Sequence, residues 1–259
     1  TLLDRWIASE LSLTIEKVED AVECYQFANA LREAENFIWH LFADNYLEMI
    51  KYRLYEKRLP SEYIKNVYDD ALKLIAPILV HITEEVHSHL IGGKSIHNSK
   101  WPSNYSVDEE SLKIGRLAKD IITEIRRYKS ETGMPLNKEM DKITIFTPHD
   151  IFDVIDDIKG TMNIKEIMVS KDTPEFEEII SNVTPEFSII GPKFGKDTST
   201  IVELLTAPEN AKRLIEEGEL EINGFLLKKE YISKIERVYE QKGKRVELIE
   251  HPEFYIKLH

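Results

Sequence analysis

Apolar residues recur every three or four positions through most of the first 130 residues, and this periodicity restricts the fold more than any other feature of the chain. Such spacing places apolar side chains on one stripe of an α-helix, and that stripe must pack against another element. Four stretches of this kind predict four long helices, over residues 3–25, 27–49, 64–90 and 114–128. The short connection between the first two indicates antiparallel neighbours, so we expect an antiparallel helical bundle.

Glycine and proline mark the interruptions. Pro77 lies inside the third stretch, where its missing backbone N–H predicts a kink. Gly92 and Gly93 end that stretch and predict a loop or small hairpin before the fourth. Gly133, followed by Pro135, predicts the end of the fourth helix.

The pattern changes after Asn137, where short alternating segments replace the long stripes. Asn223-Gly224 between two apolar runs predicts a β-hairpin over 219–227. Further strands are expected at 142–146, 166–169 and 187–190, and short helices at 151–158, 198–205 and 209–216. We therefore predict a mainly α protein, with a helical bundle over 1–137 and a small α+β domain over 138–259.

Composition limits the environment of the chain. It is 42% hydrophobic and 31% charged, which is typical of soluble globular proteins. No apolar run reaches the length of a membrane span, no signal peptide is evident, and the single cysteine, Cys24, fits a reducing compartment. We expect a cytoplasmic protein without a membrane partner. Because the chain starts within a helical pattern and without a methionine, we also expect it to be an excised piece of a longer polypeptide.

The formal net charge of -13 does not favour nucleic-acid binding by the surface as a whole, since phosphate contacts require lysine and arginine. Binding would depend on local basic patches. The sequence offers three: Lys51, Arg53, Lys57 and Arg58 interleaved with Tyr52 and Tyr55; Arg126, Arg127 and Lys129 around Tyr128; and Lys242, Lys244 and Arg245. Taken singly, each patch is explained as simply by a solvated helix end or hairpin tip.

No set of residues forms a catalytic or metal site by its spacing. His81, Glu84, Glu85 and His87 resemble a zinc helix, but six residues separate the histidines, which therefore lie on different helix faces. The glycine- and lysine-rich run 191–196 could bind a phosphate ahead of a helix, although a turn that requires glycine is the simpler interpretation. We expect no catalytic residue, no metal and no cofactor in this chain.

A series of short segments between residues 4 and 137 carries a resemblance to a known family. They are Asp4-Arg5-Trp6-Ile7, Tyr25-Gln26-Phe27-Ala28-Asn29-Ala30, Phe37-Ile38-Trp39-His40 with Asp44-Asn45-Tyr46-Leu47-Glu48, Leu74-Ile75-Ala76-Pro77 with Thr83-Glu84-Glu85, and Ser95-Ile96-His97 with Trp101-Pro102. In this order they resemble the anticodon-binding domain of class I aminoacyl-tRNA synthetases of the valine, isoleucine and leucine group. One departure is Val80, which stands where the family has a second proline.

Within that group, segments 125–131 and 134–137 are most similar to the valine enzymes. Segment 191–196 is also similar to isoleucine enzymes, so an isoleucine or leucine enzyme stays open, as does a helical interaction module without enzymatic function. The family's catalytic signatures, H-I-G-H and K-M-S-K-S, are absent here. The resemblance therefore implies tRNA binding by this chain, and an upstream catalytic domain of the same polypeptide that attaches valine to its tRNA with ATP and magnesium.

The family layout suggests where a tRNA would lie. At 1.5 Å per residue, the first helix carries the chain about 30 Å from the catalytic module, to a turn at Tyr25-Gln26-Phe27. If the bundle alternates up and down, the loop 94–101 shares that far end. Stacking and base-edge hydrogen bonds then favour seven anticodon-loop candidates: Tyr25, Gln26, Phe27, Lys94, His97, Asn98 and Lys100. Taken one at a time, the aromatic residues Tyr25, Phe27 and Trp101 are explained more simply as core residues.

The first two basic patches would lie at the opposite end of the bundle, nearer the tRNA stem. Their cations are the candidates for contacts with the tRNA backbone: Lys51, Arg53, Lys57, Arg58, Arg126, Arg127 and Lys129.

Overall fold

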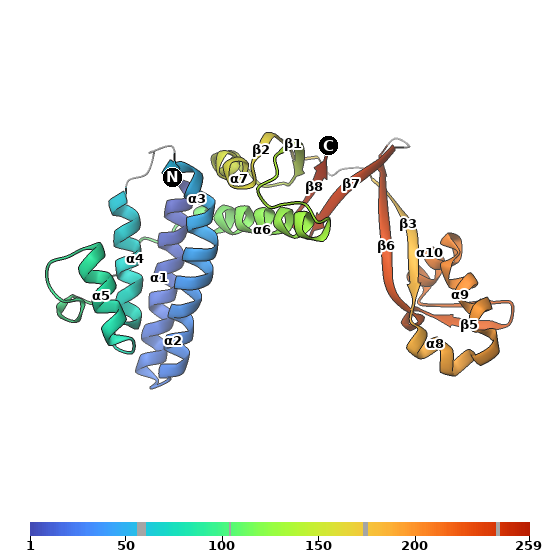
Figure 1. Ribbon diagram of the computed structural model, residues 1–259, viewed down its shortest axis with the longest axis horizontal. Coiled ribbons are helices and arrows are strands. Elements are labelled where there is room, and N and C mark those ends of the chain that lie inside the picture. The colour runs from blue at the N-terminus through green and yellow to red at the C-terminus, as the bar shows by residue number, and fades with distance from the viewer. Residues whose placement is uncertain (56–60, 104, 173–175, 242–243) are drawn as a thin grey trace. The chain divides into compact units, whose positions relative to one another are not determined.

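The structure is a computed structural model that describes residues 1–55, 61–103, 105–172, 176–241 and 244–259. Contacts divide the chain into two compact units, one of residues 1–172 with 249–256 and one of 173–248 with 257–259 (Figure 1). The first is mostly helical and the second mixes helices with strands, which confirms the predicted fold class. No helix among the described residues is both long and apolar enough to cross a membrane.

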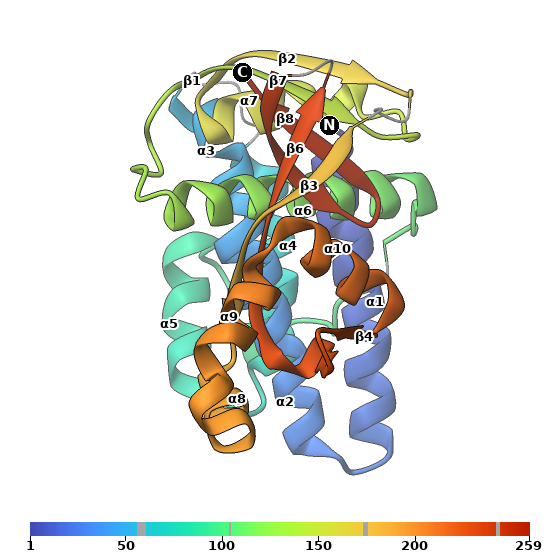
Figure 2. The same ribbon diagram turned by 90° about the vertical axis from the view of Figure 1, so that its right-hand side faces the viewer.

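Helices make up most of the first unit. In chain order they are α1 (Leu2–Glu23), α2 (Phe27–Glu35), the π-helix η1 (Asn36–Leu47), α3 (Glu48–Tyr55), α4 (Ser61–Ile75), α5 (Val80–Leu90), the 3-10 turn η2 (Ile96–Asn98) and α6 (Glu109–Glu131). All four predicted stretches are mostly helical, and the third is divided into α4 and α5. The run from α2 to α3 returns alongside α1, as expected, whereas α6 lies across α1 (Figures 1 and 2).

A glycine explains how closely α6 approaches α1. Trp6 of α1 is completely buried, and a Cβ added at Gly115 of α6 would lie only 2.2 Å from its Cγ. Any side chain at this position would therefore push the two helices apart. The core of α1 continues through Leu3, Ile7 and Leu11, which are also fully buried and follow the predicted apolar stripe.

The expected kink at Pro77 is wrong, because the helix ends there instead. α4 stops at Ile75 and α5 begins at Val80. Pro77 has no N–H to donate, and its ring would clash with a continuing helix. The backbone N–H groups of Ile78 and Leu79 both donate to the carbonyl of Ile75, at 3.0 and 2.8 Å, and close the turn.

The first unit continues past Asn137, where we expected a domain boundary. β1 (Met140–Phe146), the short η3 (Phe152–Val154), α7 (Ile155–Met162) and β2 (Ile164–Ser170) follow the bundle, and β1 pairs in parallel with β2. α7 packs against α3: a Cβ added at Gly160 would lie 2.5 Å from Cγ of Tyr52. This packing holds the segment in the helical unit, and the compact units divide after Asp172.

The second unit holds a small apolar core between short elements. These are β3 (Glu177–Pro185), α8 (Phe187–Phe194), η4 (Gly195–Asp197), α9 (Thr198–Thr206), α10 (Pro208–Glu217), β4 (Glu219–Ile222), β5 (Phe225–Lys228), η5 (Lys229–Tyr231), β6 (Ile232–Gln241) and β7 (Lys244–His251), which crosses into the first unit. β3 pairs antiparallel with β6, and β6 with β7. The last strand, β8 (Phe254–Leu258), lies mostly in the first unit, beside β1.

Sequence patterns located part of the second unit. Both predicted helices are present as α9 and α10, and β4 and β5 form the predicted hairpin, with positive φ angles of 51° at Asn223 and 80° at Gly224. The strand expected at 187–190 is wrong: this segment begins α8. The Glu186 side chain accepts a hydrogen bond from the backbone N–H of Ser188, and helical spacing turns Ile190 and Phe194 toward the core.

Candidate nucleic-acid interface

α1 ends in a turn that displays two aromatic rings. The helix has 22 residues and is therefore about 33 Å long. We call residues 24–27, which follow it, the distal turn. Tyr25 has a φ of 58°, a conformation that costs a non-glycine residue about 1–3 kcal/mol. Its ring meets that of Phe27 edge to face, with centroids 6.3 Å apart.

Exposure decides the role of these rings. Tyr25 is 82% exposed and Phe27 is 55% exposed, so neither is a core residue as the sequence alone suggested. Gln26 between them is also exposed, and its Oε1 accepts a hydrogen bond from Nδ2 of Asn29 at 2.7 Å. A strained residue that presents an aromatic ring to solvent is a candidate for ligand contact, since burial does not stabilise it.

The loop before α6 reaches the same end of the bundle. Trp101 is 41% exposed, and its Nε1 donates to Oε1 of Glu19, one turn from the end of α1, at 2.8 Å. Nε2 of His97 lies 3.1 Å from the carbonyl oxygen of Val80, at the start of α5. The chain then returns along α1, because Tyr105 exchanges hydrogen bonds with Ser12. Residues 97–101 therefore lie near the distal turn.

The candidate side chains of this loop face solvent. Lys94, His97, Asn98 and Lys100 are all exposed. Within the described parts of the chain, neither Lys94 nor Lys100 forms an ion pair. Lys94 follows α5 and lies beside its second half, farther from the distal turn than His97, since its carbonyl oxygen is 3.1 Å from Nε2 of His87. The loop thus offers an unpaired ammonium group and an amide near the aromatic distal turn, and a second unpaired ammonium group, that of Lys94, farther from it.

Sequence reasoning missed an apolar surface between α4 and α5. Ile78, Leu79, Val80 and Ile82 are each at least 38% exposed. The signal was available, because a run of apolar residues follows a proline that ends a helix. Ile78, Leu79 and Val80 lie at or beside the break to which His97 bonds, so this surface adjoins the exposed loop.

Arg53, a candidate for backbone contacts, is not available to a tRNA. It is 7% exposed, and its guanidinium donates to Asp157 and, at 2.8 Å, to Oγ1 of Thr1. Asp4, 3.4 Å from the guanidinium, also accepts a hydrogen bond from Tyr46 at 2.9 Å. Burial and the neighbouring carboxylate of Asp4 raise the pKa of the Tyr46 phenol, so it remains a donor. This buried cluster joins α1, α3 and α7.

Lys129 is likewise buried and committed to the fold. Its Nζ donates to three backbone carbonyl oxygens, those of Leu136 at 3.0 Å, Lys138 at 2.7 Å and Met162 at 2.9 Å. The side chain is completely buried, and burial lowers the pKa of its ammonium. The prediction that Lys129 contacts a tRNA is therefore wrong: it ties the end of α6 to the start of β1 and the end of α7.

Comparison with known proteins identifies the family. Residues 4–145, more than half of the chain, match the family described as the anticodon-binding domain of tRNA ligase. The chain belongs to this family. Similar proteins include the valine–tRNA ligases of Methanothermobacter thermautotrophicus (38% identical, 99% of this chain and 31% of the relative), Pyrococcus furiosus (38%, 95% and 30%) and Thermococcus kodakarensis (40%, 85% and 26%). The chain therefore spans less than a third of the length of these relatives.

Other basic candidates of the anticodon-binding domain remain at its surface. Lys51 is exposed and pairs with Glu48 at 3.1 Å. Arg127 is exposed but pairs with Glu124 at 2.6 Å and Glu131 at 3.8 Å, and Arg126 is half-buried. Lys57 and Arg58 lie outside the described residues. These positions offer fewer free charges than the sequence patches suggested.

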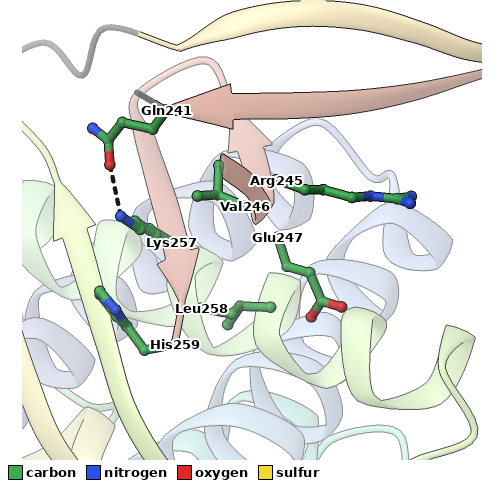
Figure 3. Close-up of a pocket in the computed structure, with 7 residues that line it drawn as sticks. All are labelled: Gln241, Arg245, Val246, Glu247, Lys257, Leu258 and His259. Atoms are coloured by element: carbon green, nitrogen blue, oxygen red, sulfur yellow. Dashed lines mark hydrogen bonds between the residues drawn. The ribbon is translucent and has the colours of Figure 1, made fainter. Parts of the chain in front are cut away.

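The third basic patch lies outside the segment matched to the anticodon-binding domain. Lys242 and the side chain of Lys244 lie outside the described part of the structure. Arg245 lines a hollow of about 780 Å³ in the second unit together with Glu247, Lys257 and other residues (Figure 3). Nζ of Lys257 donates to Oε1 of Gln241 at 2.6 Å. The mixture of charges there does not define a phosphate site.

Proposed function

We propose that the chain is the tRNA-binding part of a valine–tRNA ligase, and that the distal turn and residues 97–101 border the anticodon loop. The observation that carries this placement is the exposed edge-to-face pair of Tyr25 and Phe27 at the far end of α1. Single-stranded RNA loops are bound by stacking unpaired bases on aromatic side chains. Membership of a family described by anticodon binding supports the same assignment.

Similarity along the whole chain favours valine as the amino acid. The relative from Methanothermobacter is named a valine–tRNA ligase and aligns with 99% of the chain, beyond the segment that matches the domain family. Relatives from Pyrococcus and Thermococcus carry the same name. The second unit is thus shared with proteins of that name, which supports valine over isoleucine or leucine.

The activity belongs to a longer polypeptide in this proposal. An upstream catalytic domain would form valyl-adenylate with ATP and magnesium and transfer valine to the tRNA, in the cytoplasm. The 259-residue chain would supply affinity and anticodon recognition only. Purified alone, it should show no valine-dependent pyrophosphate exchange.

Equilibrium binding to RNA transcripts tests the proposal. The purified chain is titrated with valine tRNA, isoleucine tRNA and a valine tRNA with a replaced anticodon, at several salt concentrations. We expect the valine transcript to bind most tightly and the anticodon replacement to weaken binding. Tighter binding of the isoleucine transcript would reassign the amino acid. Equal binding of all three RNAs would refute anticodon recognition and favour a helical interaction module.

A further inference from the structure

A buried histidine connects the core of the bundle to the loop that carries the RNA-binding candidates. His87 of α5 is 5% exposed. Its Nδ1 faces Oδ1 of Asp69 on α4, and its Nε2 lies 3.1 Å from the carbonyl oxygen of Lys94. Both partners are hydrogen-bond acceptors when the carboxylate is ionised. His87 thus lies between a fixed helix and the start of the loop.

Both hydrogen bonds of His87 can form only if the Asp69–His87 pair holds one proton more than a neutral imidazole beside an ionised carboxylate. A neutral imidazole has a single N–H and can donate to only one of two acceptors. Both hydrogen bonds form if His87 is doubly protonated, or if it is neutral and Asp69 holds the proton. Without that proton, a nitrogen lone pair faces either the Asp69 carboxylate or the Lys94 carbonyl, and one bond is lost.

Charged neighbours compensate a positive imidazole. On α4, Nζ of Lys73 lies 3.0 Å from Asp69 and 2.7 Å from Asp70. The carboxylate of Asp70 also accepts a hydrogen bond from Tyr105 at 2.6 Å. Glu84, one turn before His87 on α5, adds a third carboxylate. Three carboxylates and one ammonium group thus surround His87, so a protonated imidazole reduces the excess of negative charge.

The same face of α5 binds the next residues of the loop. Val80, Glu84 and His87 are spaced four and three residues apart, which places them on one side of the helix. Oε2 of Glu84 accepts hydrogen bonds from Oγ of Ser95 at 2.8 Å and from the backbone N–H of Ile96 at 2.9 Å. The carbonyl of Val80 lies 3.1 Å from His97. One face of α5 therefore holds the loop in place from residue 94 to residue 97 through these hydrogen bonds.

We propose that the proton shared by Asp69 and His87 is a switch that fixes the loop 94–98 for RNA binding. With the proton present, the loop is anchored at Lys94 and displays its basic and amide side chains. As pH rises and the proton leaves, the remaining N–H of His87 donates to the ionised carboxylate of Asp69, which is a stronger acceptor than a carbonyl. The anchor at Lys94 is then lost and RNA binding weakens. Glu84 and His87 act as positioning residues that do not themselves touch RNA. The effect on RNA binding rests on the proposed function. The shared proton and the hydrogen bond between His87 and the Lys94 carbonyl do not depend on it.

The anchor can be tested on the chain without RNA. Nitrogen NMR of the imidazole rings reports whether both nitrogens of His87 carry protons, and amide exchange of Ile96 reports loop closure. As the pH is raised from about 6 to about 8.5, we expect the pair to lose its shared proton and the protection factor of the Ile96 amide, the intrinsic exchange rate divided by the measured rate at the same pH, to fall. His87→Gln should leave the protection factor of Ile96 independent of pH. His89→Gln is the matched control, since His89 lies on the exposed face of the same helix and bonds within it.

RNA binding provides the second readout. At constant ionic strength, the affinity of the chain for valine tRNA should fall about tenfold across the same pH range. His89→Gln should follow the unaltered chain, and His87→Gln should bind weakly at every pH. Glu84→Gln, which keeps an acceptor for Ile96, should bind better than Glu84→Ala. Circular dichroism verifies that each variant is folded.

The outcomes separate the switch from the function. An Asp69 carboxylate that is ionised while one His87 nitrogen is unprotonated at about pH 6, or the same pH profile for binding by the unaltered chain and by His87→Gln, would overturn the switch. If no RNA binds at any pH, the proposed function fails, and the NMR and exchange data still decide whether the proton anchors the loop.

Discussion

The two ends of the helical bundle use the same residue types in opposite ways. Where α1 begins, the basic and aromatic side chains of Arg53, Tyr46 and Tyr52 turn inward and bond to Asp4 and Asp157. Where α1 ends, aromatic rings turn outward and Lys100 of the loop is unpaired within the described structure. The difference is the presence of buried carboxylates. A basic and aromatic patch indicates RNA binding only when the fold does not already use its charges.

The largest test of this comparison removes the central charge of the inner cluster. Arg53→Met should lower the free energy of unfolding by about 3–5 kcal/mol, because Asp157 and Asp4 are left buried without a cation. Urea denaturation measures the loss. Lys51→Met, on the same helix but exposed, should change stability by no more than about 0.5 kcal/mol. A stable Arg53→Met variant with weakened tRNA binding would place Arg53 on the RNA after all.

A smaller loss is expected at the end of α6. Lys129→Met should cost about 2–3 kcal/mol of unfolding free energy, because three carbonyl oxygens, of which that of Met162 is buried, lose their donor. Its near neighbour Arg127, which is exposed, provides the control as Arg127→Met. Thermal and urea unfolding should separate the two variants. Equal stability would mean that water replaces the ammonium group and that the site is more open than the structure shows.

A substitution at the distal turn should lower the affinity for tRNA without lowering the stability of the fold. Tyr25→Gly removes the ring but suits the positive φ, so stability should not fall. Affinity for valine tRNA should fall by about 1–3 kcal/mol if the ring stacks on a base. Phe152→Ala is a matched control, since Phe152 is 79% exposed but lies on η3, after β1. Unchanged affinity of Tyr25→Gly would exclude stacking at this position.

The smallest effect concerns salt. Lys100→Ala should reduce the slope of log affinity against log salt concentration by about 1, as expected for one lost phosphate contact. Arg127→Ala should reduce the slope less, because its guanidinium is paired with Glu124 and Glu131. Binding measured at four or more salt concentrations resolves the two slopes. If Arg127→Ala changes the slope more, the tRNA backbone lies along α6.

Sequence periodicity located the helices of the first unit because each stripe is long. It did not show that Asn36–Leu47 forms a π-helix, since the apolar spacing of that stretch also suits an α-helix. The strands β3, β6, β7 and β8 were not predicted, because charged residues obscure the alternation and the partner of β3, β6, lies far along the chain. Short apolar runs such as 187–190 do not distinguish a strand from a helix.

Two buried cations could have been recognised from the sequence. Arg53 lies four residues after Met49 and seven after Tyr46, and Lys129 lies four residues after Ile125, so each continues an apolar stripe. The pairing of Arg53 with Asp157 could not be foreseen, because 104 residues separate them. The exposure of Tyr25 could not be foreseen either, since an aromatic residue at a helix end suits a core equally well.

The path of the chain has a consequence for truncation and domain exchange. The second unit is inserted into the first, because the chain leaves the first unit after Asp172 and returns at Ile249. Phe254 and Ile256, at 1% and 0% exposure, then contribute to the interior of the first unit. A stop codon after Asp172 would therefore delete interior residues along with the inserted unit. Replacing 173–248 by a short glycine-serine linker would retain both residues, and only such an internal deletion can reveal what the insertion contributes.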